Sequence, residues 1–254
     1  EINKSIEEKG VCLLHGVTSS GKTEIYIKLI EEELNKGKQV LYLLPEIALT
    51  TQIINRLRKH FGNKVGVSHS RMSNNERVEI WNAVKEKDIQ KTQYPIMLGA
   101  RSALFLPFDN LGLIIVDEEH EPSFKQFQPS PRYHARDAAI YLSYLHKAKV
   151  LLGSATPSVE TYYNTKIGKF ALVELNSRFG NMQLPEIHTV DIKKAHLKKQ
   201  MEYHFSPFLL KHIGAALKKG KQIILFQNRR GYAPLLECNL CSWTPSCNNC
   251  DVSL

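Results

Sequence analysis

Gly16-Val-Thr-Ser-Ser-Gly-Lys-Thr23 decides the fold, because it fits the phosphate-loop pattern G-x-x-x-x-G-K-[ST]. An apolar run precedes it and an amphipathic run follows it, which predicts the strand and helix that the pattern requires. In such a loop the glycines let backbone N–H groups face phosphate oxygens, and the start of the helix adds partial positive charge. The stretch predicts a nucleotide-binding site, against the alternative of a chance glycine-rich turn.

The loop supplies the candidate nucleotide ligands, which are Gly16, Thr18, Gly21, Lys22 and Thr23. Lys22 is expected to reach the β- and γ-phosphates of ATP, and the Thr23 hydroxyl is expected to ligate Mg²⁺. The sequence therefore predicts ATP and Mg²⁺ as cofactors.

An acidic segment, Asp117-Glu-Glu-His120, follows another apolar run. A phosphate-loop ATPase needs an acid at a strand end to hold Mg²⁺, often through water, and Asp117 suits that role. Glu118 suits the base that polarises the attacking water, and His120 is a candidate sensor of the γ-phosphate. By itself the segment also fits a solvated acidic turn, but the upstream phosphate loop favours catalysis. The candidate catalytic residues are Lys22, Asp117, Glu118 and His120.

Short apolar runs alternate with longer amphipathic stretches, which predicts an α/β fold with a mostly parallel sheet and helices on both faces. Ligands of such sheets bind at the carboxyl ends of the strands. The expected strands are Val11–His15, Gln39–Leu44, Lys64–Val67, Pro95–Gly99, Leu113–Val116 and Lys149–Leu152. The expected helices are Thr23–Asn35, Leu49–Phe61, Asn74–Lys87 and His134–His146.

The pattern changes near residue 176, where periodicity weakens and charges increase. A helix at Ser206–Lys219 and a strand at Lys221–Gln227 are then expected to restart the βα pattern. The predicted domains are an ATP-binding lobe at 1–175, a linker at 176–205, the start of a second lobe at 206–236 and a partial zinc-binding segment at 237–254.

Composition favours a globular protein that binds a polyanion. The chain has 254 residues, 43% of them hydrophobic, and a net charge of +9. This charge points to nucleic acid before membrane, although a protein can also be basic without such a partner. The sequence contains no run of 18 apolar residues, so it predicts no membrane span. Because the chain does not begin with Met and stops soon after a cysteine pair, we expect a piece of a longer protein.

Four of the five cysteines lie close together near the end, which favours metal binding over disulfides and suits a reducing cytoplasm. Two CxxC pairs are typical of one Cys₄ zinc site, but the five residues between them form a short spacer for that closure. The candidate zinc ligands are Cys238, Cys241, Cys247 and Cys250.

Three motifs together resemble superfamily 2 helicases: the phosphate loop, the acidic segment and Gly153-Ser-Ala-Thr-Pro157. Longer stretches resemble one family among them, the primosomal replication-restart DNA helicases. These stretches are Leu44–Thr50, His69-Ser70, Gly99–Pro107, Asp117–Gln126, Arg132–Asp137 and Asn228–Pro234.

The resemblance implies a RecA-like P-loop NTPase lobe, the start of a second RecA-like lobe and part of a Cys-rich zinc-binding insertion. It implies a 3′-to-5′ DNA helicase that acts at forked DNA with other primosome proteins. Ser154 and Thr156 match the motif that couples ATP state to lobe movement. In the family the two cysteine pairs belong to different zinc sites, so this chain would hold two half-sites.

The segment after the acidic motif resembles the family's aromatic-rich loop, which links DNA contact to ATP hydrolysis. Aromatic faces stack on bases and basic side chains meet phosphates, although a solvated loop with packed aromatics is an alternative. Arg101 just past a strand end is a further DNA candidate, with capping or packing as its alternative. The predicted DNA contacts are Arg101, Lys125, Arg132 and Tyr133.

The leading hypothesis is an ATP-dependent DNA helicase. Two others remain open: an ATP-switched DNA-docking module, and a double-strand translocase without unwinding activity. A helicase motor needs a second lobe that supplies an arginine finger, and the family places it beyond residue 254. We therefore expect this chain by itself to hydrolyse ATP slowly.

Overall fold

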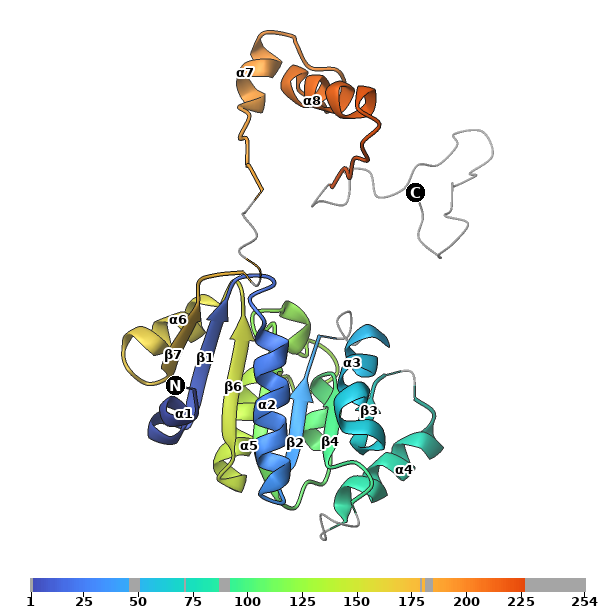
Figure 1. Ribbon diagram of the computed structural model, residues 1–254, viewed down its shortest axis with the longest axis vertical. Coiled ribbons are helices and arrows are strands. Elements are labelled where there is room, and N and C mark those ends of the chain that lie inside the picture. Colours follow the sequence, from blue (N-terminus) through green and yellow to red (C-terminus); the bar gives the residue numbers. More distant parts are fainter. Residues whose placement is uncertain are drawn as a thin grey trace. The chain divides into compact units, whose positions relative to one another are not determined.

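The structure is a computed structural model that describes residues 2–45, 51–70, 72–86, 92–178, 180 and 185–226. The chain divides into two compact units, Glu1–Leu184 and Pro185–Leu254. Figure 1 shows the sheet and helices of the first unit and the helices of the second. In the part of the chain that is described, no helix has the length and apolar character needed to cross a membrane.

The first unit is built on a seven-stranded sheet in the order β3-β4-β2-β5-β6-β1-β7. Every strand pair is parallel. The strands are β1 Val11–Gly16, β2 Gln39–Leu43, β3 Val65–Ser68, β4 Ile96–Gly99, β5 Leu111–Asp117, β6 Lys149–Ser154 and β7 Ala171–Leu175. The inner strands are apolar almost throughout because both faces of the sheet are covered. The predicted α/β class is confirmed.

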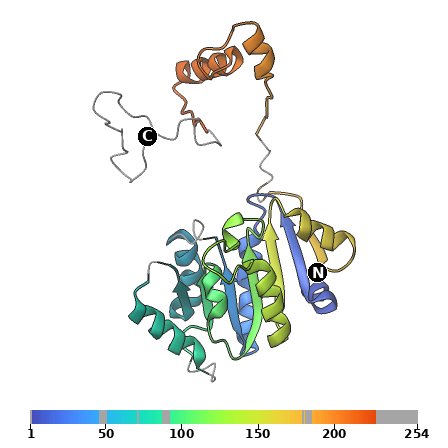
Figure 2. The ribbon, with the colours of Figure 1, turned by 180° about the vertical axis from the view of Figure 1, so that it is seen from behind.

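Helices cover both faces of this sheet (Figures 1 and 2). One buried cluster joins Leu14 and Tyr42 to α1, α2 and α3, and the other joins Leu13 and Leu41 to α4 and α5. This division follows from the two-residue period of a strand. The helices are α1 Ile2–Lys9, α2 Lys22–Asn35, α3 Thr51–Phe61, α4 Asn74–Lys85, α5 Ala135–His146 and α6 Val159–Lys166, with 3₁₀ turns η2 Gly62–Lys64, η3 Arg101–Phe105 and η4 Pro122–Phe124.

Three elements, α1, α6 and β7, were not predicted from the sequence. Helix α1 is mostly polar or charged and buries one apolar side chain, Ile6, so its periodic signal is weak. Strand β7 lies at the edge of the sheet, where partial exposure permits the polar residue Glu174 inside a short run. Both elements owe their form to the neighbours against which they pack rather than to a local pattern.

The second unit contains α7 Ile192–Leu197, inside the segment predicted as a linker, and α8 Pro207–Lys218. Ser206 is the N-cap of α8, and its side chain accepts a hydrogen bond from the Leu209 backbone N–H at 3.2 Å. The strand predicted at Lys221–Gln227 is wrong over its described residues 221–226, which form no strand. Ile224 is 93% exposed and Phe226 is 84% exposed, because no described strand pairs with this apolar run.

Candidate functional site

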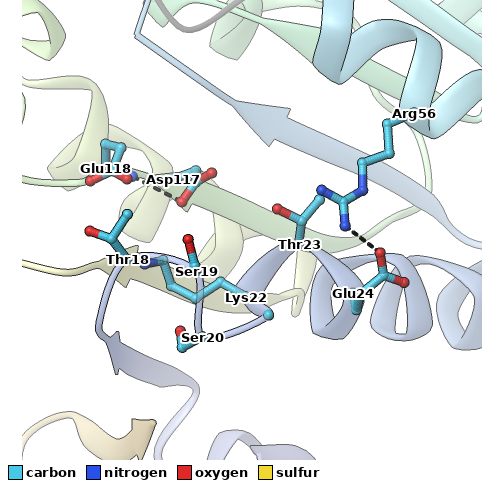
Figure 3. A pocket seen from close by; sticks show the side chains of 10 residues that line it. Thr18, Ser19, Ser20, Lys22, Thr23, Glu24, Arg56, Asp117 and Glu118 are labelled. Carbon is cyan, nitrogen blue, oxygen red and sulfur yellow. Dashed lines mark hydrogen bonds and ion pairs between the residues drawn. The ribbon is translucent and has the colours of Figure 1, made fainter. Parts of the chain in front are cut away.

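The phosphate loop connects the carboxyl end of β1 to the first turn of α2 (Figure 3). Gly21 stands at the N-cap of α2 with φ of 89°, a left-handed conformation that favours glycine. Gly16 is fixed by space, because a Cβ on it would lie 2.7 Å from the Ser20 Oγ. The two glycines therefore permit the tight curl that turns backbone N–H groups toward a bound anion.

The polar side chains of the loop are ready for a ligand. The Lys22 ammonium donates to the backbone carbonyl of Gly16 at 2.7 Å, so it rests on its own loop. The Ser20 Oγ is buried and has no hydrogen-bond partner within the described residues. A buried hydroxyl without a partner costs free energy, which a phosphate oxygen in this position would relieve.

Asp117 ends β5 beside the loop and is held by two tyrosines. Its Oδ1 accepts from the Tyr26 hydroxyl at 2.9 Å, and its Oδ2 accepts from the Tyr42 hydroxyl at 3.1 Å. Burial raises the pKa of the Asp117 carboxyl, while both hydrogen bonds and the charge of Lys22 oppose the rise. Burial also raises the pKa of both phenols well above the usual range, so they remain protonated donors.

Space for this arrangement comes from Gly153 on β6. A Cβ at that position would lie 1.8 Å from the Tyr26 hydroxyl oxygen and 3.1 Å from the Asp117 Oδ1. Gly153 belongs to a motif visible in the sequence, whereas no motif singles out either tyrosine. Tyr26 lies on α2 and Tyr42 on β2, so their convergence is visible in the fold rather than in the sequence.

Glu118 turns the chain away from the strand with a left-handed φ of 50°. Its side chain is 38% exposed, and burial followed by the charge of Asp117 raises its pKa. The His120 ring lies 2.8 Å from the Ser154 Oγ through Nδ1 and 3.4 Å from the Thr156 Oγ1 through Nε2. The structure thus brings His120 together with both residues predicted to couple nucleotide state to movement.

A cavity of about 590 Å³ lies between the phosphate loop and the acidic segment (Figure 3). This volume is within the usual range for ligand sites. Thr18, Lys22, Thr23, Asp117 and Glu118 line it, as does Gly21, whereas Gly16 and His120 are not among its lining residues. A loop lysine, a hydroxyl at the start of α2 and a carboxylate opposite them fit the phosphates and Mg²⁺ of a nucleotide.

Arg56 on α3 also lines this cavity, although no sequence motif singles it out. Its guanidinium pairs with the Glu24 carboxylate at the start of α2, as Figure 3 shows. The two partners lie on different helices and far apart in the sequence, so the sequence does not reveal this ion pair.

The predicted DNA-contact segment Phe124–Tyr133 lies within a loop, residues 120–134, that closes on itself through an antiparallel bridge between Lys125 and His134. Phe124 is buried, whereas Phe127 is exposed beneath the Lys125 ammonium at 5.4 Å from the ring centroid. Arg132 is exposed, and Tyr133 packs edge to face against Phe105. Lys125 and Arg132 therefore remain open to solvent, while Tyr133 contributes to packing.

Arg101, the first residue of η3, binds this loop through hydrogen bonds. Its Nη1 donates to the backbone carbonyls of Ser123 at 3.2 Å and Lys125 at 3.0 Å. This is the packing role that the sequence left as an alternative to DNA contact. Arg101 also lines a groove beside the loop, so its guanidinium borders solvent on that side.

That groove encloses about 580 Å³ and combines basic and aromatic side chains. Arg77 and Trp81 enter it from α4, and Phe105 enters from η3. Trp81 is 46% exposed and Phe105 is 60% exposed, so both side chains are accessible from solvent. Exposed rings beside arginines suit single-stranded nucleic acid. None of these three residues was predicted, because α4 and η3, which carry them, lie apart along the chain.

The predicted zinc ligands Cys238, Cys241, Cys247 and Cys250 lie outside the described residues. Within the described ranges, no group of three or more His, Cys, Asp or Glu side chains could hold a metal ion. Zinc binding therefore stays a prediction, as does the role of Asn228–Pro234, which also lies outside the described residues.

Comparison with known proteins gives a family match and close relatives. The DEAD/DEAH box helicase family matches residues 1–165. "Replication restart protein PriA" of Bacillus subtilis (strain 168) is 43% identical over 248 residues, covering 98% of this chain and 30% of that protein. The protein of the same name from Rickettsia felis is 46% identical over 238 residues, covering 94% of this chain and 36% of that protein.

The chain thus spans about a third of the length of these curated relatives. Among solved structures, RecG bound to a three-way DNA junction matches with a TM-score of 0.49 and 17% identity, over 72% of this chain and 24% of that chain.

Proposed function

The chain belongs to the DEAD/DEAH box helicase family, and from this premise we propose that it forms the ATP-binding lobe of a DNA helicase that acts in replication restart. The observation that carries the proposal is the cavity in which Lys22, Thr23, Asp117 and Glu118 meet. The restart role rests on relatives named as replication restart proteins that match nearly the whole chain.

Nucleotide binding begins at the phosphate loop. The Lys22 ammonium leaves the Gly16 carbonyl and binds the β- and γ-phosphates, while loop N–H groups donate to phosphate oxygens. The Thr23 hydroxyl and the Asp117 carboxylate would hold Mg²⁺, which would supply positive charge to neutralise the phosphates. The hydrogen bonds from Tyr26 and Tyr42 keep the Asp117 carboxylate oriented toward the cavity.

Glu118 is the proposed general base. It lines the cavity, and its pKa is raised by burial and by the charge of Asp117, which makes its carboxylate a better proton acceptor. In this role Glu118 orients the attacking water and takes its proton. His120 then reports the state of the γ-phosphate to Ser154 and Thr156, with which it is in contact.

Single-stranded DNA is the proposed partner of the groove beside the loop 120–134. Arg77 and Arg101 supply positive charge in the groove that holds the exposed rings of Trp81 and Phe105. Lys125, elsewhere on the loop, adds a charge over the exposed ring of Phe127. Stacking on such rings is worth about 1–3 kcal/mol per base. Forked DNA, 3′-to-5′ movement and other primosome proteins belong to the same proposal through the resemblance to restart helicases.

Turnover by the chain itself is expected to be slow. The residues that line the nucleotide cavity include one arginine, Arg56, and its guanidinium pairs with Glu24. Transition-state charge on the transferred phosphoryl group usually needs an unpaired arginine, which contributes about 10³–10⁵-fold. We propose that the second helicase lobe supplies that group in the whole protein.

The test combines ATP turnover with binding of a fluorescent oligothymidine. The wild-type chain should bind the oligonucleotide, and Trp81→Ala and Phe105→Ala should weaken that binding by about tenfold or more, as expected from loss of stacking. Tyr141→Ala, on the exposed face of α5, is the matched aromatic control and should bind normally.

Glu118→Gln should bind ATP as wild type does and lose about 10²-fold or more of the turnover. Glu121→Gln changes a partly exposed neighbouring acid that does not line the cavity, and it should retain turnover. Equal turnover in Glu118→Gln and wild type would remove Glu118 as the base. Tighter binding of duplex than of single strands would favour a double-strand translocase over the helicase.

We further propose that the cysteine pairs bind Zn²⁺, either as one Cys₄ site or as two half-sites. Metal analysis of the purified chain distinguishes them, since a closed site retains one equivalent of zinc against a chelator and half-sites retain none.

A further inference from the structure

Glu119 differs from both of its neighbours because it is fully buried. Its Oε1 accepts from the Ser158 backbone N–H at 2.7 Å. Its Oε2 accepts from the Thr161 hydroxyl at 2.8 Å and from the Arg136 Nη1 at 3.0 Å. The carboxylate thus ties the end of β5 to the start of α5 and to the N-terminal turn of α6. None of these residues lines the nucleotide cavity.

Arg136 completes this cluster from the first turn of α5. It is 8% exposed, its Nη1 also donates to the Ser158 Oγ at 2.6 Å, and its Nε donates to the Asp137 carboxylate at 2.9 Å. We call Glu119, Arg136, Ser158 and Thr161 the loop anchor. Because its charges lie away from water, the ion pair cannot separate without a large desolvation cost, and its members move as one unit.

The anchor joins the two ends of the predicted DNA loop. Glu119 immediately precedes the loop and Arg136 lies just after it, so their ion pair closes a segment of 17 positions. At the near end, the Glu119 backbone N–H donates to the Gly153 carbonyl at 3.1 Å, beside Asp117. At the far end, Arg136 follows His134, whose bridge to Lys125 sets the loop.

We propose that the Glu119–Arg136 ion pair is the joint through which nucleotide bound at Asp117 and Glu118 sets the position of the loop 120–134. Both are positioning residues, since neither lines the nucleotide cavity. Glu118, with a left-handed φ of 50°, lies between the two sites in the sequence: Asp117 before it lines the cavity, and Glu119 after it belongs to the loop anchor. A ligand that draws Asp117 and Glu118 toward the phosphates therefore moves Glu119, and with it Arg136 and the loop. The inference rests on the proposed function.

The test is hydrogen exchange of the whole chain, measured by mass spectrometry with and without Mg²⁺ and a non-hydrolysable ATP analogue. In wild type the analogue should slow exchange in the phosphate loop 16–23 and in the loop 120–134. In Glu119→Gln the phosphate loop should still be slowed. Its loop 120–134 should lose most of the response, which we expect to be about fivefold or more in wild type.

Two further variants make the test specific. Asp137→Asn removes the exposed partner of Arg136 but keeps the buried pair, so it should respond as wild type does. Arg136→Lys keeps the charge but not the fork that reaches Glu119 and Ser158 together, so it should lose most of the loop response. If Glu119→Gln does not fold, the loop response of Arg136→Lys tests the proposal in its place.

The outcomes are distinguishable. If wild type shows no slowing in the phosphate loop, the nucleotide site itself is wrong. If the phosphate loop responds and the loop 120–134 does not, the joint is wrong while the nucleotide site stands. A full response in folded Glu119→Gln or in Arg136→Lys would also overturn the joint, as would its loss in Asp137→Asn.

Discussion

Adjacent carboxylates belong to two regions that are built in opposite ways. In the nucleotide corner, formed by the phosphate loop with Asp117 and Glu118, Lys22 rests on a carbonyl of its own loop and the Ser20 hydroxyl has no partner among the described residues. In the loop anchor, both carboxylate oxygens of Glu119 accept hydrogen bonds from donors on α5 and at the start of α6. The difference teaches that Lys22 and the Ser20 hydroxyl are left available to a ligand, whereas the Glu119 carboxylate spends its hydrogen bonds on holding the architecture.

The largest expected effect contrasts the two neighbouring acids in stability. Glu119→Ala leaves the Arg136 charge buried without its partner, which should lower the free energy of unfolding by about 3–5 kcal/mol. Glu118→Ala removes a half-exposed side chain and should change it by less than about 0.5 kcal/mol. Urea unfolding of both variants measures this, and similar losses would erase the distinction between the two regions.

Tyr42→Phe tests the part of the nucleotide corner that is saturated, the support of Asp117. Loss of the hydroxyl removes the donor to the Asp117 Oδ2 and should cost about 1.5–3 kcal/mol, since hydrogen bonds to charged groups lie in that range. It should also raise the Mg²⁺ concentration needed for nucleotide binding. Tyr141→Phe, with a 66% exposed ring, is the control, and an equal cost there would contradict the account.

Gly153→Ala tests the space beside Tyr26. The added methyl would lie 1.8 Å from the Tyr26 hydroxyl oxygen, so the ring must shift, and overpacking of this kind costs about 1–3 kcal/mol. In α8, a Cβ added to Gly214 would meet no atom within 4 Å. Gly214→Ala should therefore cost nothing or stabilise the helix. Thermal unfolding should show a lower melting temperature for Gly153→Ala than for wild type, and an unchanged or higher one for Gly214→Ala.

The smallest effect concerns a capping box outside both regions, which sets the scale of an ordinary local interaction. Ser73 is the N-cap of α4. Its side chain accepts a hydrogen bond from the Glu76 backbone N–H, and the Glu76 side chain accepts one from the Ser73 backbone N–H. Ser73→Ala should cost about 1 kcal/mol at neutral pH.

That cost should depend on pH. Hydrogen bonds from the Ser73 backbone and side chain lower the pKa of Glu76 below its usual value of 4.5. A lowered pKa means that the stabilisation is present above that value and is lost as pH falls through the folded-state pKa. Urea unfolding at neutral and acidic pH should therefore show the gap between wild type and Ser73→Ala narrowing in acid. A gap that widens would contradict the assignment.

Much of the fold follows from the sequence because buried parallel strands are continuous apolar runs. β2 and β5 were predicted on that basis. The same rule failed at residues 221–226, where an apolar run has no described partner strand. A strand is a property of a pair, so an apolar run by itself indicates the potential for one.

The candidate site divides in the same way. The phosphate loop and Asp117 were found because their spacing is local and chemically specific. Tyr26, Arg136 and Trp81 were missed because each acts through a partner that lies far along the chain. Tyr26 in particular occupies the buried face of α2, where the sequence pattern indicates packing and gives no sign of its hydrogen bond to Asp117.

The account depends most directly on the nucleotide corner, and equilibrium binding of a fluorescent ATP analogue in the presence of Mg²⁺ tests it. Wild type and Lys28→Ala, a matched exposed lysine on the same helix, should bind alike. Lys22→Ala should bind about tenfold to a hundredfold more weakly, because it loses charge-assisted hydrogen bonds to the phosphates. Equal affinity in Lys22→Ala and Lys28→Ala would contradict the account.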